Sequence, residues 1–162
     1  MSAEEKSMSI IVTKGSLEWA YPPFILATTA AAIGLPVRLF FTFYCLPLLI
    51  KDLKLKVTAS GNPAMKMPMI GMHMGLPNLV TAIPGVDAGC SVMMKNLIKK
   101  KGVASIEELR EMAVEAEVRM IACQMTMDLF EYDKEDMIEG IDIGGAATYI
   151  ECATQADINL FI

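Results

Sequence analysis

The sequence predicts a single α/β domain, built as a three-layer α/β/α sandwich with a mostly parallel sheet. Three observations predict this fold. The 162 residues suit one domain that buries its own core. Short apolar runs alternate along the whole chain with segments of helical pattern, which is typical of strand–helix–strand units. One of these runs, VRLFFTF at 37–43, is apolar on both faces except for Arg38, as expected of a central parallel strand.

The first elements follow from local signals. Residues 1–7 are polar and are expected to form a disordered start. The run SIIVT at 9–13 predicts a first core strand, and Lys14, Gly15 and Ser16 form the turn after it. The loop at the carboxyl end of this strand therefore carries a cation, a hydroxyl group and a flexible backbone.

A helix is expected over residues 23–33, after a looser turn over 17–21. Two prolines at 22 and 23 suit the opening of a helix better than its interior. After the strand at 37–43, a short helix is expected at 46–53. The stretch 24–50 is almost uncharged, but glycine, proline and arginine divide it into pieces shorter than the ~20 residues of a membrane-spanning helix. A buried helix and a buried strand are therefore expected here.

The segment 57–89 is predicted to be a long irregular loop rich in methionine. Such segments in compact domains are commonly functional or interfacial. A helix is expected over 88–101, with lysines in its last turn and a glycine after it. The capping box SIEE at 105–108 then opens an amphipathic helix that runs to about residue 117.

The remaining elements alternate in the same way. A short buried strand at 118–122 leads to Cys123, and a helix is expected over 124–131. A minor strand at 137–143, a helix at 146–154 and a last strand at 158–162 complete the pattern. The loops that follow the first, second and third strands should meet at the carboxyl edge of the sheet, where open α/β sheets bind ligands. The strand order does not follow from the sequence.

Cys123 is the candidate catalytic residue. A thiol at the carboxyl end of a parallel strand, where the next helix opens, lies beside backbone N–H groups that have no intrahelical partner and at the positive end of the helix dipole. Both favour the thiolate, which is the reactive form. The alternative is that Cys123 is a buried hydrophobe, as free cysteines commonly are.

The remaining candidates are weaker. Lys14, with Gly15 and Ser16, is a candidate for anion or thiolate support, against the alternative of an ordinary solvated lysine. Cys45 and Cys152 are candidate second thiols, although their apolar surroundings favour core packing for both.

Composition argues against several classes of protein. The net charge is −5, which argues against nucleic-acid binding. The four cysteines form no C-x-x-C pair and no cluster with the single histidine, so no metal site, thioredoxin-type dithiol or cofactor is predicted. The polar, acidic start lacks a signal-peptide pattern, and a cytoplasmic location is expected. The 54% hydrophobic composition leaves membrane association or a subunit interface open.

The methionine-rich loop supports an alternative function. Thioethers and His73 are soft ligands of the kind that bind Cu(I), which would make the chain a Cu(I)- or membrane-associated binding protein with structural cysteines. The simpler interpretation is that these methionines supply adaptable apolar surface over the core or on a neighbouring subunit.

Several separate blocks resemble one known family in its own order: GNPAMKMP, MMKNLIKKKGV, IEELREMA, IACQMTMD, IGGAATYIECA and INLFI. They resemble the DsrE/DsrF-like family, in particular its sulfur-metabolism branch that carries the peroxiredoxin label. The resemblance covers nearly the whole chain, from about residue 8 to residue 162. It implies a flavodoxin-like DsrE fold and homo-oligomers, commonly trimers or hexamers.

The resemblance also implies a function. Members of the family carry sulfane sulfur as a cysteine persulfide or thiosulfonate and exchange it with rhodanese-like and TusA-like sulfur carriers. The cysteine of their I-A-C-Q-M block corresponds to Cys123. We therefore expect a sulfurtransferase or sulfur carrier that loads Cys123 in a small cleft. Its wall is expected to include Met125, Met72 and Met74.

Overall fold

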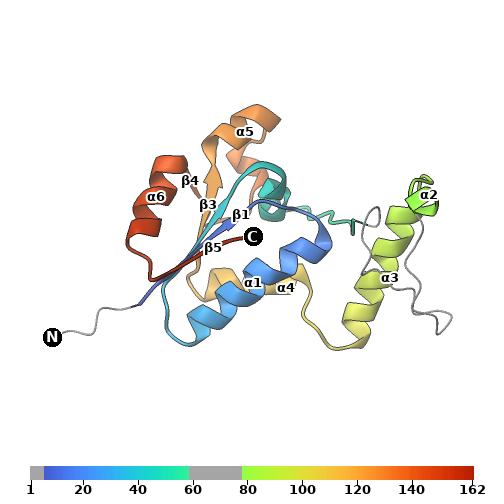
Figure 1. Cartoon of the computed structure of the whole chain (residues 1–162), viewed down its shortest axis with the longest axis horizontal. Coiled ribbons are helices and arrows are strands. Elements are labelled where there is room, and N and C mark those ends of the chain that lie inside the picture. The colour runs from blue at the N-terminus through green and yellow to red at the C-terminus, as the bar shows by residue number, and fades with distance from the viewer. Residues whose placement is uncertain (1–5, 59–77) are drawn as a thin grey trace.

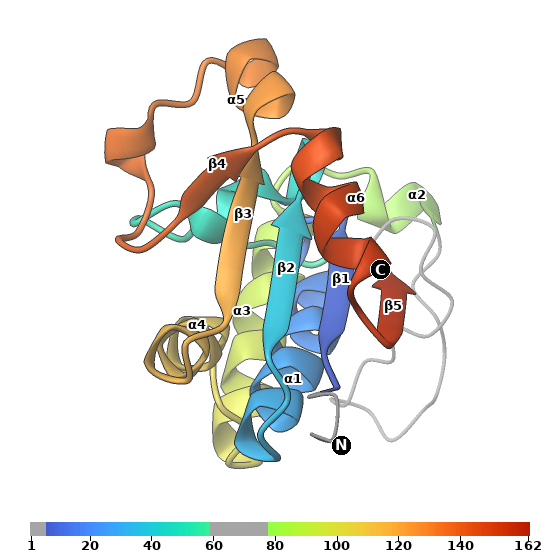
Figure 2. The ribbon, with the colours of Figure 1, turned by 90° about the vertical axis from the view of Figure 1, so that its left-hand side faces the viewer.

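The structure is a computed structural model that describes residues 6–58 and 78–162. Within them, one sheet has the strand order β4–β3–β2–β1–β5, and every strand pair in it is parallel. The strands are β1 (Met8–Val12), β2 (Val37–Phe41), β3 (Arg119–Cys123), β4 (Asp142–Gly144) and β5 (Ile158–Phe161). Helices lie on both faces of the sheet (Figures 1 and 2). The prediction of a three-layer α/β sandwich is confirmed.

The register of the strands aligns the loops that matter for function. Val12 pairs with Phe41, and Phe41 pairs with Ala122, so the carboxyl ends of β1, β2 and β3 lie in one row. Cys123, one residue beyond that row, pairs with Gly144 of β4. The predicted meeting of these three loops at one edge of the sheet is confirmed, and β2 lies between the other two strands.

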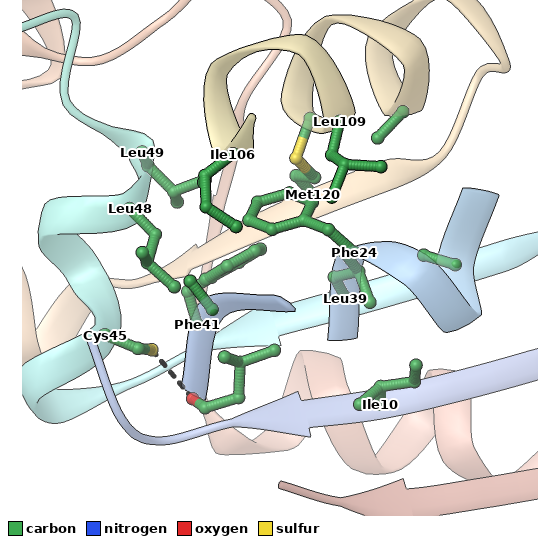
Figure 3. Close-up of a cluster of buried hydrophobic side chains, with 14 of the residues drawn as sticks. Ile10, Phe24, Leu39, Phe41, Cys45, Leu48, Leu49, Ile106, Leu109 and Met120 are labelled. Atoms are coloured by element: carbon green, nitrogen blue, oxygen red, sulfur yellow. Dashed lines mark hydrogen bonds between the residues drawn. The ribbon is translucent and has the colours of Figure 1, made fainter. Parts of the chain in front are cut away.

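Successive side chains of a strand point to opposite faces, and each face packs against its own helices. One face of the sheet carries Ile10, Leu39 and Met120 and is covered by α1 (Leu17–Ala32) and α4 (Ile106–Glu115). The side chains of this face and of the two helices form the main core (Figure 3). The other face carries Phe40, Ile121 and Cys123 and packs against α6 (Ala146–Thr154) through Tyr149 and Cys152. Cys123 therefore belongs to the smaller cluster, on the α6 side.

The N-terminal elements differ in two ways from expectation. Ser7, expected in a disordered start, is buried, and its backbone N–H donates to Asp157 at 2.9 Å. Helix α1 begins at Leu17, so the prediction of a loose turn over 17–21 is wrong. Leu17 and Ala20 are buried, and their packing outweighs the two backbone hydrogen bonds that Pro22 and Pro23 remove from the helix interior.

The chain leaves β2 earlier than expected. The strand ends at Phe41, and a 3-10 helix, η1, spans Phe43–Leu49, in place of a strand to residue 43 and a helix at 46–53. Phe43 has a φ of +56°, a left-handed conformation that cannot continue a strand. Leu46 and Leu48 are fully buried, which anchors η1 on the core.

The middle of the chain is less irregular than expected, as far as it is described. Helix α2 spans Asn78–Thr81 and α3 spans Val86–Lys100, so the predicted loop at 57–89 contains one short helix and the start of another. Gly85, with a φ of +94°, allows α3 to begin two residues early. Helix α3 lies away from the sheet (Figure 1). The capping box of α4 is confirmed, since Ser105 and Glu108 exchange hydrogen bonds of 2.7 and 3.2 Å.

The C-terminal third follows the expected order with one correction. Helices α5 (Gln124–Phe130) and α6 and strand β5 lie where the pattern placed them. The minor strand expected at 137–143 is wrong, because β4 spans Asp142–Gly144 and follows the 3-10 helix η2 (Lys134–Asp136). Gly140, with a φ of +79°, makes a turn inside the expected strand, and Met137 forms only an isolated antiparallel bridge with Ile50.

The apolar stretch 24–50 folds as most of α1, strand β2 and η1. None of the helices in the described part of the chain is long and apolar enough to cross a bilayer.

Candidate functional site

Cys123 is both the last residue of β3 and the N-cap of α5. Its residue is only 5% exposed, so the sulfur lies just below the surface at the carboxyl edge of the sheet. In Figure 2, α5 stands directly beyond the arrowhead of β3. The strand-to-helix junction that the sequence predicted for this cysteine is present.

The environment of Cys123 favours its thiolate. Burial by itself raises the pKa of the thiol, since it removes water from the charged form. Hydrogen bonds from the Thr126 hydroxyl and backbone N–H, the Thr42 hydroxyl and the Met125 N–H act the other way. The net result is a pKa below the ordinary value of a cysteine. The hydrogen bonds outweigh the burial.

Thr126 is fixed by a contact from η1. Its side chain is completely buried, and its Oγ1 accepts a hydrogen bond from the backbone N–H of Phe43 at 3.1 Å. The same oxygen lies 3.3 Å from Thr42 Oγ1. With one lone pair of Thr126 Oγ1 occupied by Phe43, the hydroxyl proton is left for another acceptor, Thr42 Oγ1 or the Cys123 sulfur, and the hydroxyl is among the groups that lower the pKa of Cys123. Phe43, whose N–H makes this contact, has a left-handed backbone conformation, a case of backbone strain at a candidate site.

Cys45 has the opposite environment, although Thr42 contacts both thiols. Cys45 is fully buried, accepts a hydrogen bond from the Thr42 N–H at 3.0 Å, and donates its S–H to the Val12 carbonyl oxygen at 2.8 Å (Figure 3). Burial, with a smaller contribution from Cys123, raises the pKa of Cys45 far above its ordinary value. Cys45 is therefore a neutral thiol that ties η1 to β1.

The other candidate thiol, Cys152, lies on α6 in the cluster that also contains Cys123. Its sulfur accepts a long contact of 3.8 Å from Arg119 Nη1, whose guanidinium also pairs with Asp142 at 2.6 Å. Arg119 is the first residue of β3, whereas Cys123 is the last. Cys152 thus lies toward the opposite edge of the sheet from the carboxyl-edge site.

The turn after β1 contacts η1 and α1. Lys14 Nζ lies 3.4 Å from the ring centroid of Trp19 in a cation–π contact, and Ser16 Oγ donates to Glu18 at 2.8 Å. A Cβ atom at Gly15 would overlap the Tyr44 carbonyl oxygen, so this position needs glycine for the close approach of two backbone segments. None of these three residues is among the groups that lower the pKa of Cys123, and their supporting role stays a prediction.

Met125 contributes its backbone to the site more directly than its side chain. Its N–H is one of the groups that lower the pKa of Cys123, while the residue itself is 59% exposed. Met72 and Met74, expected as further parts of a cleft wall, and His73, the candidate Cu(I) ligand, lie outside the described residues. Within the described part of the chain, no group of three or more histidine, cysteine or acidic side chains could hold a metal ion.

Thr126 and Thr42, which lower the pKa of Cys123, were not predicted from the sequence. Thr126 is the third residue after a cysteine at an N-cap, the position whose backbone N–H an N-cap side chain commonly accepts. That spacing is a usable signal for Thr126 once the helix start is placed at Cys123. Thr42 lies 81 residues before Cys123 in the sequence, and only the pairing of β2 with β3 places it beside the Cys123 sulfur.

The arrangement is suited to nucleophilic chemistry at sulfur. A thiolate held by several hydrogen-bond donors attacks a disulfide or sulfane sulfur, and the same donors stabilise it as a leaving group.

Comparison with known proteins gives matches over nearly the whole chain. The model of the DsrE/DsrF/DrsH-like family matches residues 4–161. The sulfur carrier protein DsrE2 of Allochromatium vinosum is 57% identical over 159 residues, which cover 98% of this chain and 99% of that protein. The YrkE protein of Bacillus subtilis is 33% identical over 165 residues, and both chains are covered completely.

Among solved structures, the YchN protein of E. coli has a similar fold. It aligns with a TM-score of 0.58 at 14% identity, covering 97% of this chain and 99% of the YchN chain. At that identity the likeness concerns the fold alone.

Proposed function

This chain belongs to the DsrE/DsrF/DrsH-like family, and we propose that it is a sulfur carrier that accepts sulfane sulfur on Cys123 and passes it to a partner thiol. The similarity to a sulfur carrier protein over 98% of the chain supports the general role. The observation that carries the assignment to Cys123 is its position as the last residue of β3 and the N-cap of α5, only 5% exposed. There Thr126, Thr42 and Met125 lower its pKa. The other candidate thiol at this edge, Cys45, has its pKa raised.

The loading step is a displacement at sulfur. The Cys123 thiolate attacks the outer sulfur of a persulfide R–S–SH, the S–S bond breaks, and RS⁻ leaves, so that Cys123 becomes a persulfide. With tetrathionate the thiolate attacks an inner sulfur, thiosulfate leaves, and Cys123 carries a thiosulfonate group. No electron enters or leaves in either reaction, because both are exchanges between sulfur atoms.

Unloading reverses the roles. A partner thiolate attacks the outer sulfur of the Cys123 persulfide, and Cys123 departs as a thiolate. A thiol with a lowered pKa leaves faster. Rhodanese-like and TusA-like carriers are the partners that we propose for this exchange, and the chain then acts as a sulfurtransferase within a relay.

We also propose that the protein is a homo-oligomer, a trimer or a hexamer. Helix α1 supports this part of the proposal, because Trp19 and Leu26 on it and its C-cap Ile33 are exposed apolar residues spaced seven apart, on one side of the helix. Trp19 and Leu26 are each 38% exposed and Ile33 is 72% exposed. Exposed apolar side chains grouped in this way are typical of an interaction surface.

A cytoplasmic location is part of the same proposal. The four cysteines are all unpaired, and thiol exchange on Cys123 requires a compartment in which free thiols persist.

Mass spectrometry of the intact protein tests the function. The reduced protein is incubated with polysulfide or with tetrathionate, alkylated and mapped by peptide. We expect a thiol-removable sulfur or thiosulfonate adduct on the Cys123 peptide, its loss in Cys123→Ser, and its persistence in the matched control Cys90→Ser, which changes a buried cysteine on α3. Unmodified Cys123 in the folded protein, or full loading of Cys123→Ser, would contradict the proposal.

A further inference from the structure

The sulfur on Cys123 leaves only when an acceptor reaches it, and Cys123 is 5% exposed. The surface around this residue therefore selects the acceptor. The inference below rests on the proposed sulfur-carrier function, and it concerns the kind of partner that this surface fits.

Exposed apolar side chains lie on α5, the helix that Cys123 caps, and on η1, whose Phe43 N–H contacts Thr126. We call the following residues the acceptor patch: Phe43, Tyr44, Met125, Leu129 and Phe130. Tyr44 is 71% exposed, and Met125 and Leu129 are 59% and 58% exposed. The ring of Tyr44 lies 6.1 Å from that of Phe43 and 5.8 Å from that of Phe130, so the two elements form one continuous surface. Aromatic residues and methionine are the types enriched in protein interfaces.

The border of the patch is acidic. Between residues 124 and 136 the chain carries exposed carboxylates at Asp128, Glu131, Asp133, Glu135 and Asp136. The cations on this segment and just after η1 are Lys134 and Lys51, whose ammonium donates to the Glu135 carbonyl oxygen at 2.8 Å. A third, Lys14, neighbours Gly15, which packs against Tyr44. The five carboxylates outnumber these three cations. The backbone bond from Lys51 N–H to the Asp136 carbonyl oxygen at 3.0 Å holds the acidic segment near the end of η1.

We propose that the acceptor patch binds a partner protein whose reactive thiol lies on an apolar tip surrounded by lysine or arginine side chains. The apolar tip covers the aromatic surface, and the basic border complements the carboxylates, which raises the rate of encounter. A second copy of this chain docking patch to patch is the poorer occupant. A two-fold contact would place the same five carboxylates against themselves.

Disulfide exchange with two synthetic peptides tests the inference without sulfur loading. Each peptide carries one cysteine flanked by leucines and activated as a mixed disulfide with thionitrobenzoate. One has four lysines and the other four glutamates at matched positions. The Cys123 thiolate attacks the peptide sulfur, the S–S bond breaks, and thionitrobenzoate leaves and is measured by its absorbance. The rate seen in Cys123→Ser is subtracted.

We expect the basic peptide to react about tenfold faster at low salt, within the range of electrostatic steering. The ratio should fall toward one in 0.5 M salt, because exposed charges are then screened. In a variant with Asp128→Asn, Glu131→Gln and Asp133→Asn the preference should disappear. The matched control, Glu111→Gln, Glu115→Gln and Glu117→Gln, removes three exposed carboxylates from the second half of α4 and the turn after it and should keep the preference.

Three results would overturn the inference. They are equal rates for both peptides at low salt, a preference that survives the triple substitution beside the patch, and a Tyr44→Ser variant that loses subunits on size-exclusion chromatography. The last result would assign the patch to a contact between copies. Because peptide exchange does not require persulfide loading, failure of this test and failure of the sulfur-carrier function give different patterns. Loading without a basic preference rejects only the docking surface, and a basic preference without loading rejects only the carrier chemistry.

Discussion

Replacement of Thr126 by valine tests the source of the reactivity of Cys123. Valine has nearly the shape of threonine but no hydroxyl group, so the substitution removes one hydrogen bond to the sulfur and the acceptor of the Phe43 N–H. The backbone N–H groups of Thr126 and Met125 remain in place. The substitution therefore isolates one of the groups that oppose the effect of burial.

The expected change in the pKa of Cys123 follows from the typical energy of a hydrogen bond to a charged group. A hydrogen bond to a charged group contributes ~1.5–3 kcal/mol, and one pKa unit corresponds to ~1.36 kcal/mol. Removal of the hydroxyl should raise the pKa of Cys123 by about one unit, and two at the most, because the other donors redistribute around the sulfur. The variant should also lose ~1–3 kcal/mol of stability, since the Phe43 N–H loses its acceptor.

The assay is the rate of alkylation of Cys123 by iodoacetamide as a function of pH, in wild type, Thr126→Val and Thr126→Ser. Serine keeps the hydroxyl and should keep the low pKa. An unchanged pKa in folded Thr126→Val would refute the role of the hydroxyl. A rise of equal size in Thr126→Ser would assign the effect to packing.

The same pKa makes a stability prediction with a definite sign. The pKa of Cys123 is lower in the folded state than in the unfolded chain, where it is near the ordinary value of about 8.5. The resulting stabilisation is fully present above the unfolded pKa and is lost as the pH falls through the folded pKa. Denaturant midpoints of wild type and Cys123→Ser should therefore diverge as the pH rises between these two values. Parallel curves over that window would contradict the pKa shift.

Three further substitutions test other parts of the structure. Cys45→Ala should lower stability by ~1–3 kcal/mol, because it removes a buried donor to the Val12 carbonyl, while Cys123 still loads sulfur. Urea denaturation measures the stability and mass spectrometry measures the loading. Loss of loading in the folded variant would give Cys45 a chemical role. Gly15→Ala should destabilise by ~1–3 kcal/mol or more, because its Cβ overlaps the Tyr44 carbonyl, and a melting temperature equal to wild type would reject that close approach. Ser105→Ala should cost ~1 kcal/mol by breaking the capping box of α4, which a calorimetric comparison with wild type measures.

Local signals predicted the elements whose pattern does not depend on distant residues. The capping box at Ser105, the strand that ends at Cys123 and the helix after Gly145 all follow from short-range chemistry. The errors occur where packing or a single backbone angle overrides the pattern. Burial of Leu17 and Ala20 holds two prolines inside α1, and the left-handed Phe43 ends β2 early. Neither effect is visible in a window of sequence.

In the candidate site, too, local features could be predicted and features that depend on distant residues could not. The position of Cys123 could be predicted, because one strand and the following helix define it. The groups that tune it could not, since Thr42 reaches the sulfur only because β2 pairs with β3, and the strand order does not follow from the sequence. Lys14 was the natural candidate for a counter-charge, but the structure places its ammonium over Trp19. Uncharged hydroxyl and amide donors lower the pKa instead.

Thr42 also explains why two thiols at one edge of the sheet differ in reactivity. Its hydroxyl donates to Cys123, while its backbone N–H donates to Cys45 at 3.0 Å. Cys45 is fully buried and adds an S–H bond to the Val12 carbonyl, so ionising it would cost both solvation and that bond. In the proposed relay Cys45 is the poorer acceptor, because burial disfavours its thiolate. The proposed acceptor therefore reaches Cys123 from outside, across the acceptor patch of η1 and α5.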